Sequence, residues 1–417
     1  MESTKEMKNN SNGFIPDNWR EVTLGDHASV LRGGSPRPIE AYLTKDPDGI
    51  NWIKIGDVGV GDKYINQTEE RIIPEGVSRS RKVFKGDFLL SNSMSFGRPY
   101  ILNVDGCIHD GWLVIQEYYD SFTTDYLYYA LSSQYVLKQY CSMAAGSSVL
   151  NLNKDIVKKV RILVPPKEEQ KKIANALSSI DNLIADLNLA IEKKRQIKEG
   201  LMQNLLTGSI RLRGFSGEWQ NKTVGEIGFT YSGLTGKGKN DFGHGEALYI
   251  TFLNVLNNPI LKTDIFEKVD VKDGERQNKA LKGDLFFNTS SETPEEVGIC
   301  AMLNEGIENL YLNSFCFGFR LTDPEVDGLY LSYFWRSKLG REIMTTLAQG
   351  ATRYNLSKEY FNKTKILLPP LNLQRHIANT LMIAEREIAL LEAKREKYNL
   401  IKQGMMQELL TGKTRLI

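Results

Sequence analysis

The sequence is poor in the residues that build metal centres and disulfide frameworks. Its 417 residues include four histidines and four cysteines, and Cys107, Cys141, Cys300 and Cys316 form no Cys-x-x-Cys pair. Zinc sites need clustered thiolates and imidazoles, and small secreted domains need closely spaced cysteines that pair. The composition therefore predicts no metal site and a reduced, cytosolic chain.

Long apolar runs and an excess of charge of one sign are also missing. No stretch approaches the roughly 18 consecutive apolar residues that a membrane-spanning helix needs. The polar opening MESTKEMKNNSN has no apolar segment of the kind found in a secretory signal, and we expect residues 1–13 to form a flexible tail. The formal net charge is only +2, so charge alone does not indicate a nucleic-acid-binding protein.

Motifs that carry chemistry are missing as well. Gly233–Lys239 spells GxxxxGK, but Asn240 replaces the Ser or Thr that holds magnesium in a P-loop. The glycines of GDVGVG, at Gly56–Gly61, have the wrong spacing for a dinucleotide-binding turn. The target-base motif of adenine methyltransferases and the paired acidic motif of Pro-Asp nucleases are not found. The sequence therefore predicts no catalytic residue.

What the chain does contain is a long internal repeat. Residues 161–213 align without a gap on residues 365–417, and 25 of the 53 aligned positions are identical. The shared phrases are RILVPPKEEQKKIANAL and KILLPPLNLQRHIANTL, followed near the end by Leu-Leu-Thr-Gly in both copies. The offset of 204 continues upstream to Gly146 and Gly350 and then drifts. A repeat of about 200 residues exceeds a solenoid unit and indicates a duplicated domain with its connector.

The repeated tails predict long helices. Proline suits the first turn of a helix, and Gly208 and Gly412 are typical C-terminal stops. We expect the first helix to run from about Glu168 to Thr207, roughly 60 Å at about 1.5 Å per residue. Apolar residues at alternating spacings of four and three form the a/d seam of a coiled coil. The seam consists of Ile173, Leu177, Ile180, Ile184, Leu187 and Ile191 in the first tail and of Ile377, Leu381, Ala384, Ile388 and Leu391 in the second.

Two near-identical stripes in one chain indicate that the tails pair with each other, although pairing between chains stays open. The seam weakens at Lys194 and Arg395, after which Ile197 and Ile401 begin a second apolar stripe. This shift is compatible with a stutter or with a second partner surface. The tails also carry the basic excess, with ten basic against six acidic residues in the first and nine against five in the second. A solvated helix face explains this excess as well as a binding surface does.

Residues 14–160 and 214–364 keep a common framework but differ in their loops. NWIKIGDV and ALYITFLNV predict strands, as do GDFLLSNS and GDLFFNTS, and amphipathic helices follow, so each part is a mixed α/β domain. Each has a glycine-rich loop, RGGSPRP in one and SGLTGKGK in the other. His109-Asp110 has Asn313-Ser314 as its counterpart, and we expect a satisfied turn there rather than a site. A shared framework with different loops is what two domains that recognise two different targets would need.

The chain resembles the specificity subunit, HsdS, of type I restriction-modification enzymes. The resemblance rests on the LVPP…Q…IANAL and LLPP…Q…IANTL phrases, on the GSSVLNLNK and GATRYNLSK turns before them, and on the RGGSP loop. It covers both halves, from about residue 14 to the end. In the second half, SGLTG departs from the Gly-Gly-Ser/Thr-Pro loop of the family.

The resemblance implies a mixed α/β fold in which two target recognition domains, 14–160 and 214–364, are joined by two helical spacers, 161–213 and 365–417. The spacers would pack as an antiparallel coiled coil with a pseudo-two-fold repeat. Each domain would read one half of a bipartite target in double-stranded DNA, and the spacers would set the gap and dock two methyltransferase subunits. Restriction subunits would join for cleavage. S-adenosylmethionine, ATP and magnesium would bind those partners, with no cofactor on this chain, in the cytoplasm of a bacterium or archaeon.

Side chains in the unlike loops are candidate DNA contacts. Arginine suits guanine edges and phosphates, whereas Asn and Ser suit adenine edges or phosphates. The candidates are Arg32, Ser35, Arg37, Arg79, Arg81, Lys82, Asn92, Ser93, Arg98, Ser147 and Ser148 in the first half and Lys237, Lys239, Asn288, Ser290, Thr352 and Arg353 in the second. Two alternatives stay open: a coiled-coil scaffold that binds protein without recognising DNA, and a self-contained DNA-modifying enzyme with an unrecognised motif.

Overall fold

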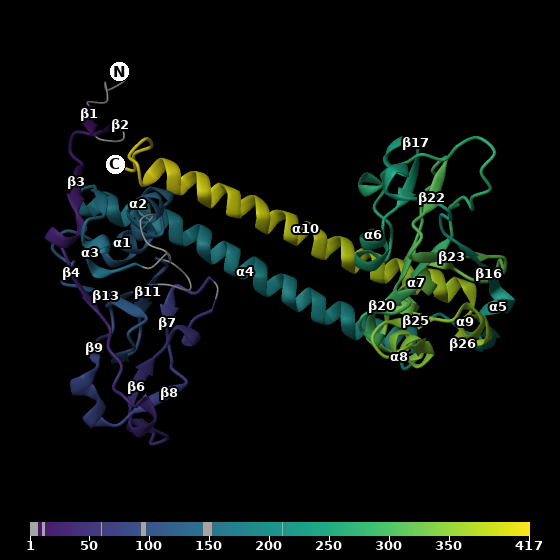
Figure 1. Cartoon of the computed structure of the whole chain (residues 1–417), viewed down its shortest axis with the longest axis horizontal. Coiled ribbons are helices and arrows are strands. Elements are labelled where there is room, and N and C mark those ends of the chain that lie inside the picture. The colour runs from purple at the N-terminus through teal and green to yellow at the C-terminus, as the bar shows by residue number, and fades with distance from the viewer. Residues whose placement is uncertain (1–6, 11–12, 60, 93–96, 145–151, 211) are drawn as a thin grey trace. The chain divides into compact units, whose positions relative to one another are not determined.

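The computed structural model describes residues 7–10, 13–59, 61–92, 97–144, 152–210 and 212–417. The chain divides into two compact units, which we call unit 1 (Met1–Leu187 with Lys394–Ile417) and unit 2 (Asn188–Ala393). Each unit contains sheets, short helices and a segment of both long helices (Figure 1). Among the described residues, no helix has the length and apolarity that crossing a membrane requires.

The two long helices are α4 (Lys167–Leu206) and α10 (Leu371–Leu409). Their ends agree with the expected Pro-Pro starts and Gly stops, since Gly208 and Gly412 have φ angles of 71° and 73°. Within unit 1 the start of α4 lies beside the end of α10, and within unit 2 the end of α4 lies beside the start of α10 (Figure 1). In each unit the two segments therefore run antiparallel.

The predicted seam supplies much of the contact between these segments. Ile173, Leu177, Leu187, Ile191, Ile377, Leu381 and Ile388 are at most 8% exposed, and Ile180, Ile184, Ala384 and Leu391 are half-buried. Ile197 and Ile401, which the pattern places in the second stripe, are instead 47% and 38% exposed. Their neighbours Lys198 and Lys402 turn toward the facing helix to pair with carboxylates. Because consecutive helical residues point about 100° apart, the isoleucines turn outward.

Unit 1 contains two five-stranded sheets. The first has the order β4 (Ser29–Arg32), β13 (Trp112–Gln116), β10 (Phe88–Ser91), β11 (Pro99–Leu102), β7 (Tyr64–Ile65). The second has the order β5 (Leu43–Thr44), β8 (Glu70–Ile72), β6 (Ile50–Ile53), β12 (Gly106–Ile108), β9 (Arg81–Val83). Two strand pairs accompany them, β3 (Arg20–Thr23) with β14 (Arg161–Val164) and β1 (Met7–Asn10) with β2 (Gly13–Pro16). The helices are α1 (Thr124–Leu131), α2 (Gln134–Ala144) and α3 (Lys154–Lys158).

Unit 2 repeats much of this plan. Its main sheet has the order β16 (Gly228–Ser232), β23 (Cys316–Leu321), β19 (Leu285–Asn288), β21 (Cys300–Met302). The other strands are grouped as β18 (Glu267–Val269), β17 (Phe242–Ile250), β22 (Leu310–Leu312), as β20 (Ser290–Ser291), β25 (Tyr354–Leu356), β24 (Ala348–Gln349), and as β15 (Gln220–Thr223) with β26 (Lys365–Leu368). The helices are α5 (Val224–Ile227), α6 (Phe252–Asn257), α7 (Gly328–Arg336), α8 (Lys338–Leu347) and α9 (Lys358–Lys363).

The duplication is visible in the topology of the two units. The order β4-β13-β10-β11 recurs as β16-β23-β19-β21, and the parallel pair β6–β12 recurs as β17–β22. The antiparallel neighbours β6–β8 and β17–β18 pair Ile50 with Ile72 and Ala247 with Val269, a shift of 197 at both positions. The framework predicted from the drifting offset is therefore present in both units.

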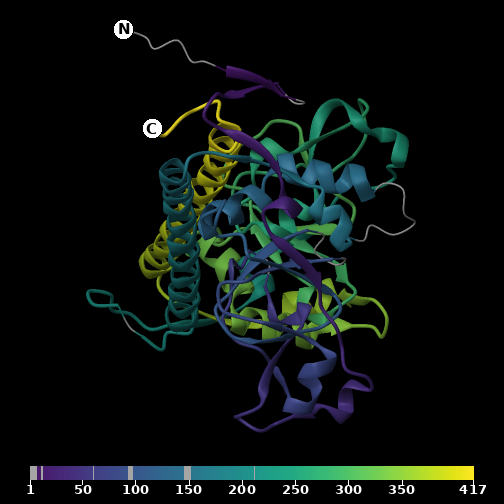
Figure 2. The same ribbon diagram turned by 90° about the vertical axis from the view of Figure 1, so that its left-hand side faces the viewer.

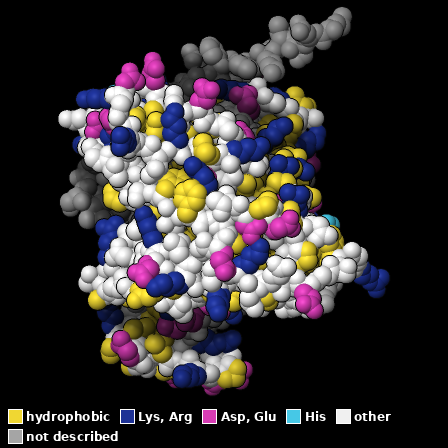
Figure 3. All heavy atoms as spheres, turned by 90° about the vertical axis from the view of Figure 1, so that its right-hand side faces the viewer, with side chains coloured by type: hydrophobic (Ala, Val, Ile, Leu, Met, Phe, Trp, Pro, Cys, Tyr) yellow, Lys and Arg dark blue, Asp and Glu magenta, His cyan; other side chains and the backbone are white. Residues whose placement is uncertain are grey.

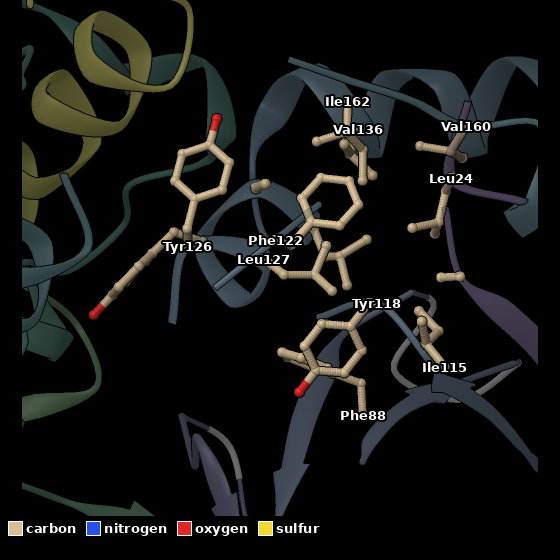
Figure 4. Packing of buried hydrophobic residues seen from close by; sticks show 14 of the residues in the cluster. Leu24, Phe88, Ile115, Tyr118, Phe122, Tyr126, Leu127, Val136, Val160 and Ile162 are labelled. Atoms are coloured by element: carbon tan, nitrogen blue, oxygen red, sulfur yellow. The ribbon is translucent and has the colours of Figure 1, made fainter. Parts of the chain in front are cut away.

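Each core includes both long helices. In unit 1, Tyr118, Phe122 and Leu127 pack among Leu24 and Phe88 (Figure 4). The same cluster continues into α4 and to the end of α10 through Leu177 and Leu409, and unit 2 has the corresponding cluster with Leu205 and Leu381. Burying a leucine fully stabilises the fold by about 1.5–3 kcal/mol. The helices are thus part of each domain's interior and not a detached stalk.

The end of α10 also closes onto the first strands of unit 1. Gly412 lies against Pro16 and Trp19, so that a Cβ at this glycine would come within 2.6 Å of the Pro16 ring. Figures 1 and 2 show the hairpin β1–β2 near the end of α10. Just beyond, Arg415 places Nε and Nη2 at 2.6 and 2.7 Å from the two carboxylate oxygens of Glu169, to which the Trp19 indole also donates at 3.0 Å.

Candidate nucleic-acid interface

The glycine-rich loop after β4 is organised by Asp110. The Ser35 hydroxyl donates to Asp110 Oδ1 at 2.9 Å, and Arg32 Nε donates to the Asp110 carbonyl oxygen at 3.3 Å. The Arg37 guanidinium lies 3.5 Å from Oδ2. The Ser35 hydrogen bond lowers the pKa of the Asp110 carboxyl, which keeps it anionic. Three predicted contact residues are therefore gathered by a fourth that sequence reasoning did not select.

The glycines of this loop are explained by close packing. A Cβ on Gly33 would lie 2.0 Å from the His109 carbonyl oxygen, and one on Gly233 would lie 2.1 Å from that of Asn313. Next to them, the backbone amides of Gly34 and Leu234 donate to Ile108 and Leu312 at 3.2 and 2.8 Å. The SGLTG loop of unit 2 thus occupies the equivalent place on the framework, although its sequence departs from the RGGSP pattern.

The expected satisfied turn at His109 is confirmed. The Gly111 amide donates to His109 Nδ1 at 2.6 Å, just as the Phe315 amide donates to Asn313 Oδ1 at 2.8 Å. Imidazole and amide serve as interchangeable acceptors here. Asp110, by contrast, has Ser314 as its counterpart, so the anionic anchor for arginines belongs to unit 1. The sequence did contain a signal for Asp110. At the corresponding positions of two otherwise similar turns, one has an aspartate and the other a serine.

A basic surface surrounds the loop in unit 1. Arg81 Nε donates to the Arg32 carbonyl oxygen at 3.3 Å, which brings the start of β9 next to the loop. Arg79 ends the preceding helical turn, with its guanidinium 5.7 Å from the centre of the Tyr42 ring. Arg32, Arg37, Arg79 and Arg81 are all exposed. Lys82 follows Arg81 on a strand, where successive side chains alternate between faces, and it lies over the Phe84 ring beside a separate hollow of about 520 Å³.

Two predicted readers lie inside the framework. Asn92 is 5% exposed and donates to the Asp110 carbonyl oxygen at 3.2 Å. Asn288 is fully buried, where it donates to Glu296 at 2.8 Å and accepts from the Ile299 amide at 2.6 Å. These buried amides hold the ends of β10 and β19. Arg98 is half-buried, and Ser93, Ser147 and Ser148 lie outside the described residues.

In unit 2 the remaining candidates separate into two places. Arg353 Nε donates to Ser290 Oγ at 3.1 Å, and Thr352 and Arg353 are exposed beside the small sheet β20-β25-β24. Lys237 lies elsewhere, with a 4% exposed side chain whose Nζ is 2.6 Å from Glu275 and lowers the pKa of that carboxyl to about 2. Lys239 is exposed, and the GxxxxGK stretch leads into a single 3-10 turn (Lys239–Asp241) and then into β17, where a P-loop would begin an α-helix.

Sequence reasoning missed Lys358 in unit 2. Its Nζ donates to Ser232 Oγ at 3.2 Å at the start of the glycine-rich loop and lies over the Phe317 ring. The lysine of the repeated NLNK and NLSK phrases was the available signal, because it falls at Lys154 and Lys358.

In the part of the chain that the structure describes, no group of three His, Cys, Asp or Glu side chains is arranged to hold a metal ion. Burial raises the pKa of the Cys316 thiol to about 12, and burial also raises that of Cys300. Thiols with raised pKa values are poor nucleophiles at neutral pH. In the view of Figure 3, basic and acidic side chains are interspersed over the surface.

The repeated glutamines explain part of the duplicated phrase. Gln170 is fully buried, where it accepts from the Thr123 amide at 2.8 Å and donates to the carbonyls of Ser121 and Pro165. Gln374 makes the same three bonds, to Asp327, Glu325 and Pro369. Every partner is shifted by 204 residues. The glutamine of Pro-Pro-x-x-x-Gln therefore fastens the start of a long helix to the loop before α1 or α7.

A second repeated contact fixes both long helices to each domain. In unit 1 the Tyr129 hydroxyl donates to Asp181 at 2.7 Å, and Lys402 of the facing helix lies 2.5 Å from the same carboxylate. In unit 2 the Tyr333 hydroxyl donates to Glu385 at 2.9 Å, and Lys198 lies 2.9 Å from it.

We call these triplets the tyrosine–carboxylate–lysine anchors. The offset of 204 relates the tyrosines, the carboxylates and, in reverse direction, the lysines. A two-fold repeat of one antiparallel helix pair has this relation.

Fold and surface together define a duplicated α/β protein with two unlike polar surfaces on like frameworks. A family model described as the type I restriction modification DNA specificity domain matches residues 16–198 and 216–399. The chain belongs to this family. As a specificity subunit it is the non-catalytic component on which DNA-sequence recognition by a type I restriction-modification system depends.

Named relatives agree with this assignment. The chain is 25% identical over 426 residues to the type I restriction enzyme MjaVIII specificity subunit of Methanocaldococcus jannaschii, covering 96% of this chain and 94% of that protein. It is 22% identical to the EcoKI specificity subunit of Escherichia coli, covering 88% and 82%.

Solved structures share the fold. One, described as showing complex assembly and conformational transition of the type I R-M system, has a TM-score of 0.62 at 17% identity, covering 96% of this chain and 99% of that one. The S subunit from M. genitalium has a TM-score of 0.56 at 16% identity, covering 98% and 99%.

Proposed function

We propose that each unit reads one half of an asymmetric, bipartite target in double-stranded DNA. The observation that carries this proposal is the like framework with unlike polar surfaces. In unit 1 the loop after β4 is organised by Asp110 and surrounded by arginines, whereas the equivalent loop in unit 2 meets Lys358. Unit 2 also has the Arg353–Ser290 pair beside its small sheet. Phosphate contacts position a protein on DNA, and base-edge contacts specify the sequence.

Polar side chains of these surfaces are the proposed readers. In unit 1 they are the exposed Arg32, Arg37, Arg79 and Arg81. In unit 2 they are the exposed Thr352 and Arg353 together with the half-buried Ser290 and Lys358. Arginine can donate two hydrogen bonds to a guanine edge, and serine or threonine can contact bases or phosphates. Asn92, Asn288 and Lys237 act as supports within the domains.

The paired helices are proposed to set the gap between the half-sites and to dock two methyltransferase subunits. Helices α4 and α10 each contribute to both units, and the tyrosine–carboxylate–lysine anchors recur in both. Because these anchors hold the two long helices in the same way in both units, the helices can offer equivalent surfaces to two equivalent partners. We place S-adenosylmethionine, ATP and magnesium on the methyltransferase and restriction subunits, with no cofactor on this chain, and place the complex in the cytoplasm with the DNA it acts on.

Exchange of one reader tests the proposal. Residues 14–155 are replaced by the matching segment of a relative with a different target, and the host's methylated sites are mapped. One half of the target is expected to change while the other half and the gap stay the same. The reciprocal exchange of residues 214–359 is the matched control and should change the other half. Simultaneous alteration of both halves by either exchange would contradict the two-reader assignment.

A further inference from the structure

Unit 1 contains a basic cleft between α2, the start of β14 and the end of α10. Its volume is about 1300 Å³, and Lys138, Lys159, Arg161 and Lys413 line it. Of the described residues that line it, none is Asp or Glu. Glu21 lies at its border, 3.6 Å from Arg161. Four cations from separate parts of the chain therefore surround one hollow, in a chain whose net charge is only +2.

Part of the lining of this cleft is apolar and is called its floor. Met143 and Met406 line it and pack against the core of unit 1, together with Leu410, which is 6% exposed. Thioether side chains are flexible and polarisable, and they accommodate varied apolar groups at binding surfaces. An apolar floor with a cationic border suits a ligand that is both acidic and amphipathic.

Among the described residues, the positions of unit 2 that correspond to the cleft carry less positive charge. At the offset of 204, Lys138 corresponds to Glu342 on α8, and Lys413 corresponds to Ser209. Gln403, which also lines the cleft, corresponds to Glu199 on α4. These replacements change the local charge from four cations to two cations and two carboxylates, while the framework stays the same. The basic cleft is thus a departure from the repeat and belongs to unit 1.

We infer that this cleft docks an acidic, amphipathic segment of a partner protein, once per chain. The inference rests on the proposed function in that the partner is a subunit of the same restriction-modification complex. A DNA backbone would satisfy the cations but has no apolar group for the methionine floor. The proposed readers of unit 1 lie beside β4 and β9, whereas the cleft is built from α2, the start of β14 and the end of α10. The repeat otherwise offers two equivalent docking positions for partner subunits. Docking at the cleft would make the position on unit 1 differ from the one on unit 2.

The first experiment identifies the occupant. The full chain is assembled with its methyltransferase and restriction subunits and treated with a carbodiimide, which joins lysines directly to carboxylates. Cross-links from Lys138, Lys159 or Lys413 to one partner segment that also contains apolar residues are expected. An assembled complex in which lysines of the long helices cross-link to partners but the cleft lysines do not would overturn the inference.

The second experiment measures affinity. Lys138→Glu with Lys159→Glu is expected to weaken subunit assembly at least tenfold and to flatten its dependence on salt, because rim charges govern electrostatic association. Lys338→Glu with Lys363→Glu places the same charge change on α8 and α9 of unit 2 and should alter assembly less than twofold. Far-UV circular dichroism and the unfolding midpoint check that both variants fold.

Three results would overturn the docking assignment. They are equal assembly by the cleft variant, equal weakening by both variants, and weakened DNA binding with assembly unchanged, which would make nucleic acid the occupant. Each of these leaves the two-reader function standing. Failure of the wild-type chain to bind any methyltransferase would overturn the function and the docking together, and it is seen before any variant is made.

Discussion

At the residue scale, the duplicated phrase is explained by a few buried polar contacts. Gln170 and Gln374 satisfy backbone groups of the preceding loop, and the tyrosine–carboxylate–lysine anchors join each domain to both long helices. Buried polar groups are costly when they lose a partner, so such residues tolerate little change. The loop side chains have no such constraint, and there the two halves differ.

Substitution of the buried glutamine tests this account. Gln170→Ala leaves the Thr123 amide and two carbonyls without their partner, and we expect a loss of about 2–4 kcal/mol in the free energy of unfolding. Gln374→Ala should cost a similar amount in unit 2. Urea unfolding followed by circular dichroism gives both values. Gln196→Ala, at an exposed position of α4, is the control and should stay within about 0.5 kcal/mol of the wild type. A loss no larger than that control at Gln170 would refute the fastening role.

At the element scale, the long helices were the easiest part to predict. Periodic apolar residues bounded by Pro-Pro and Gly gave a start at about Glu168, and α4 begins at Lys167. Periodicity alone does not place Ile197 and Ile401 relative to the facing helix, because it does not register the salt bridges that turn Lys198 and Lys402 inward. Residue type likewise indicated Asn288 as a DNA contact, although its side chain is buried and supports the domain from within. The basic cleft was invisible because α2 and the end of α10 are about 260 residues apart in the sequence.

Length of the paired helices provides the second prediction. A heptad inserted after Leu187 and another after Leu391 keeps the seam in register and adds about 10 Å at about 1.5 Å per residue. The gap between methylated half-sites should grow by about 3 base pairs, at about 3.4 Å for each. Three base pairs also rotate the groove by about 100°, so we expect weaker binding along with the longer gap.

Mapping of methylated sites in vivo decides this question. An insertion in α4 alone is the control, since it bulges against an unchanged partner and should abolish methylation or leave the gap as it was. If the double insertion yields an active enzyme that still recognises the original gap, the paired helices do not measure it.

At the scale of the whole molecule, the two junctions between a long helix and the strand that follows it are built alike. In unit 2, Gly208 at the end of α4 lies against Trp219, with a Cβ position 2.9 Å from the indole, and the intervening chain leads into β15. In unit 1, Gly412 lies against Trp19 ahead of β3, and Arg415 is held by Glu169. The first junction is joined by a covalent linker and the second by packing and an ion pair.

In topological terms the covalent and the packed junction are therefore expected to be interchangeable. Joining Ile417 to Phe14 through a short flexible linker and opening the chain between Arg213 and Gly214 would exchange the covalent junction for the packed one. We expect the permuted chain to fold, to keep both halves of its target and to lose less than about 2 kcal/mol of unfolding free energy, because loop-closure entropy changes slowly with loop length. Urea unfolding and methylation mapping measure these outcomes. As a control for the linker itself, the same linker is inserted at Gly274, a surface turn of unit 2 with a φ of 87°. A permuted chain that fails to fold would mean that the covalent junction contributes stability that the packed junction cannot replace.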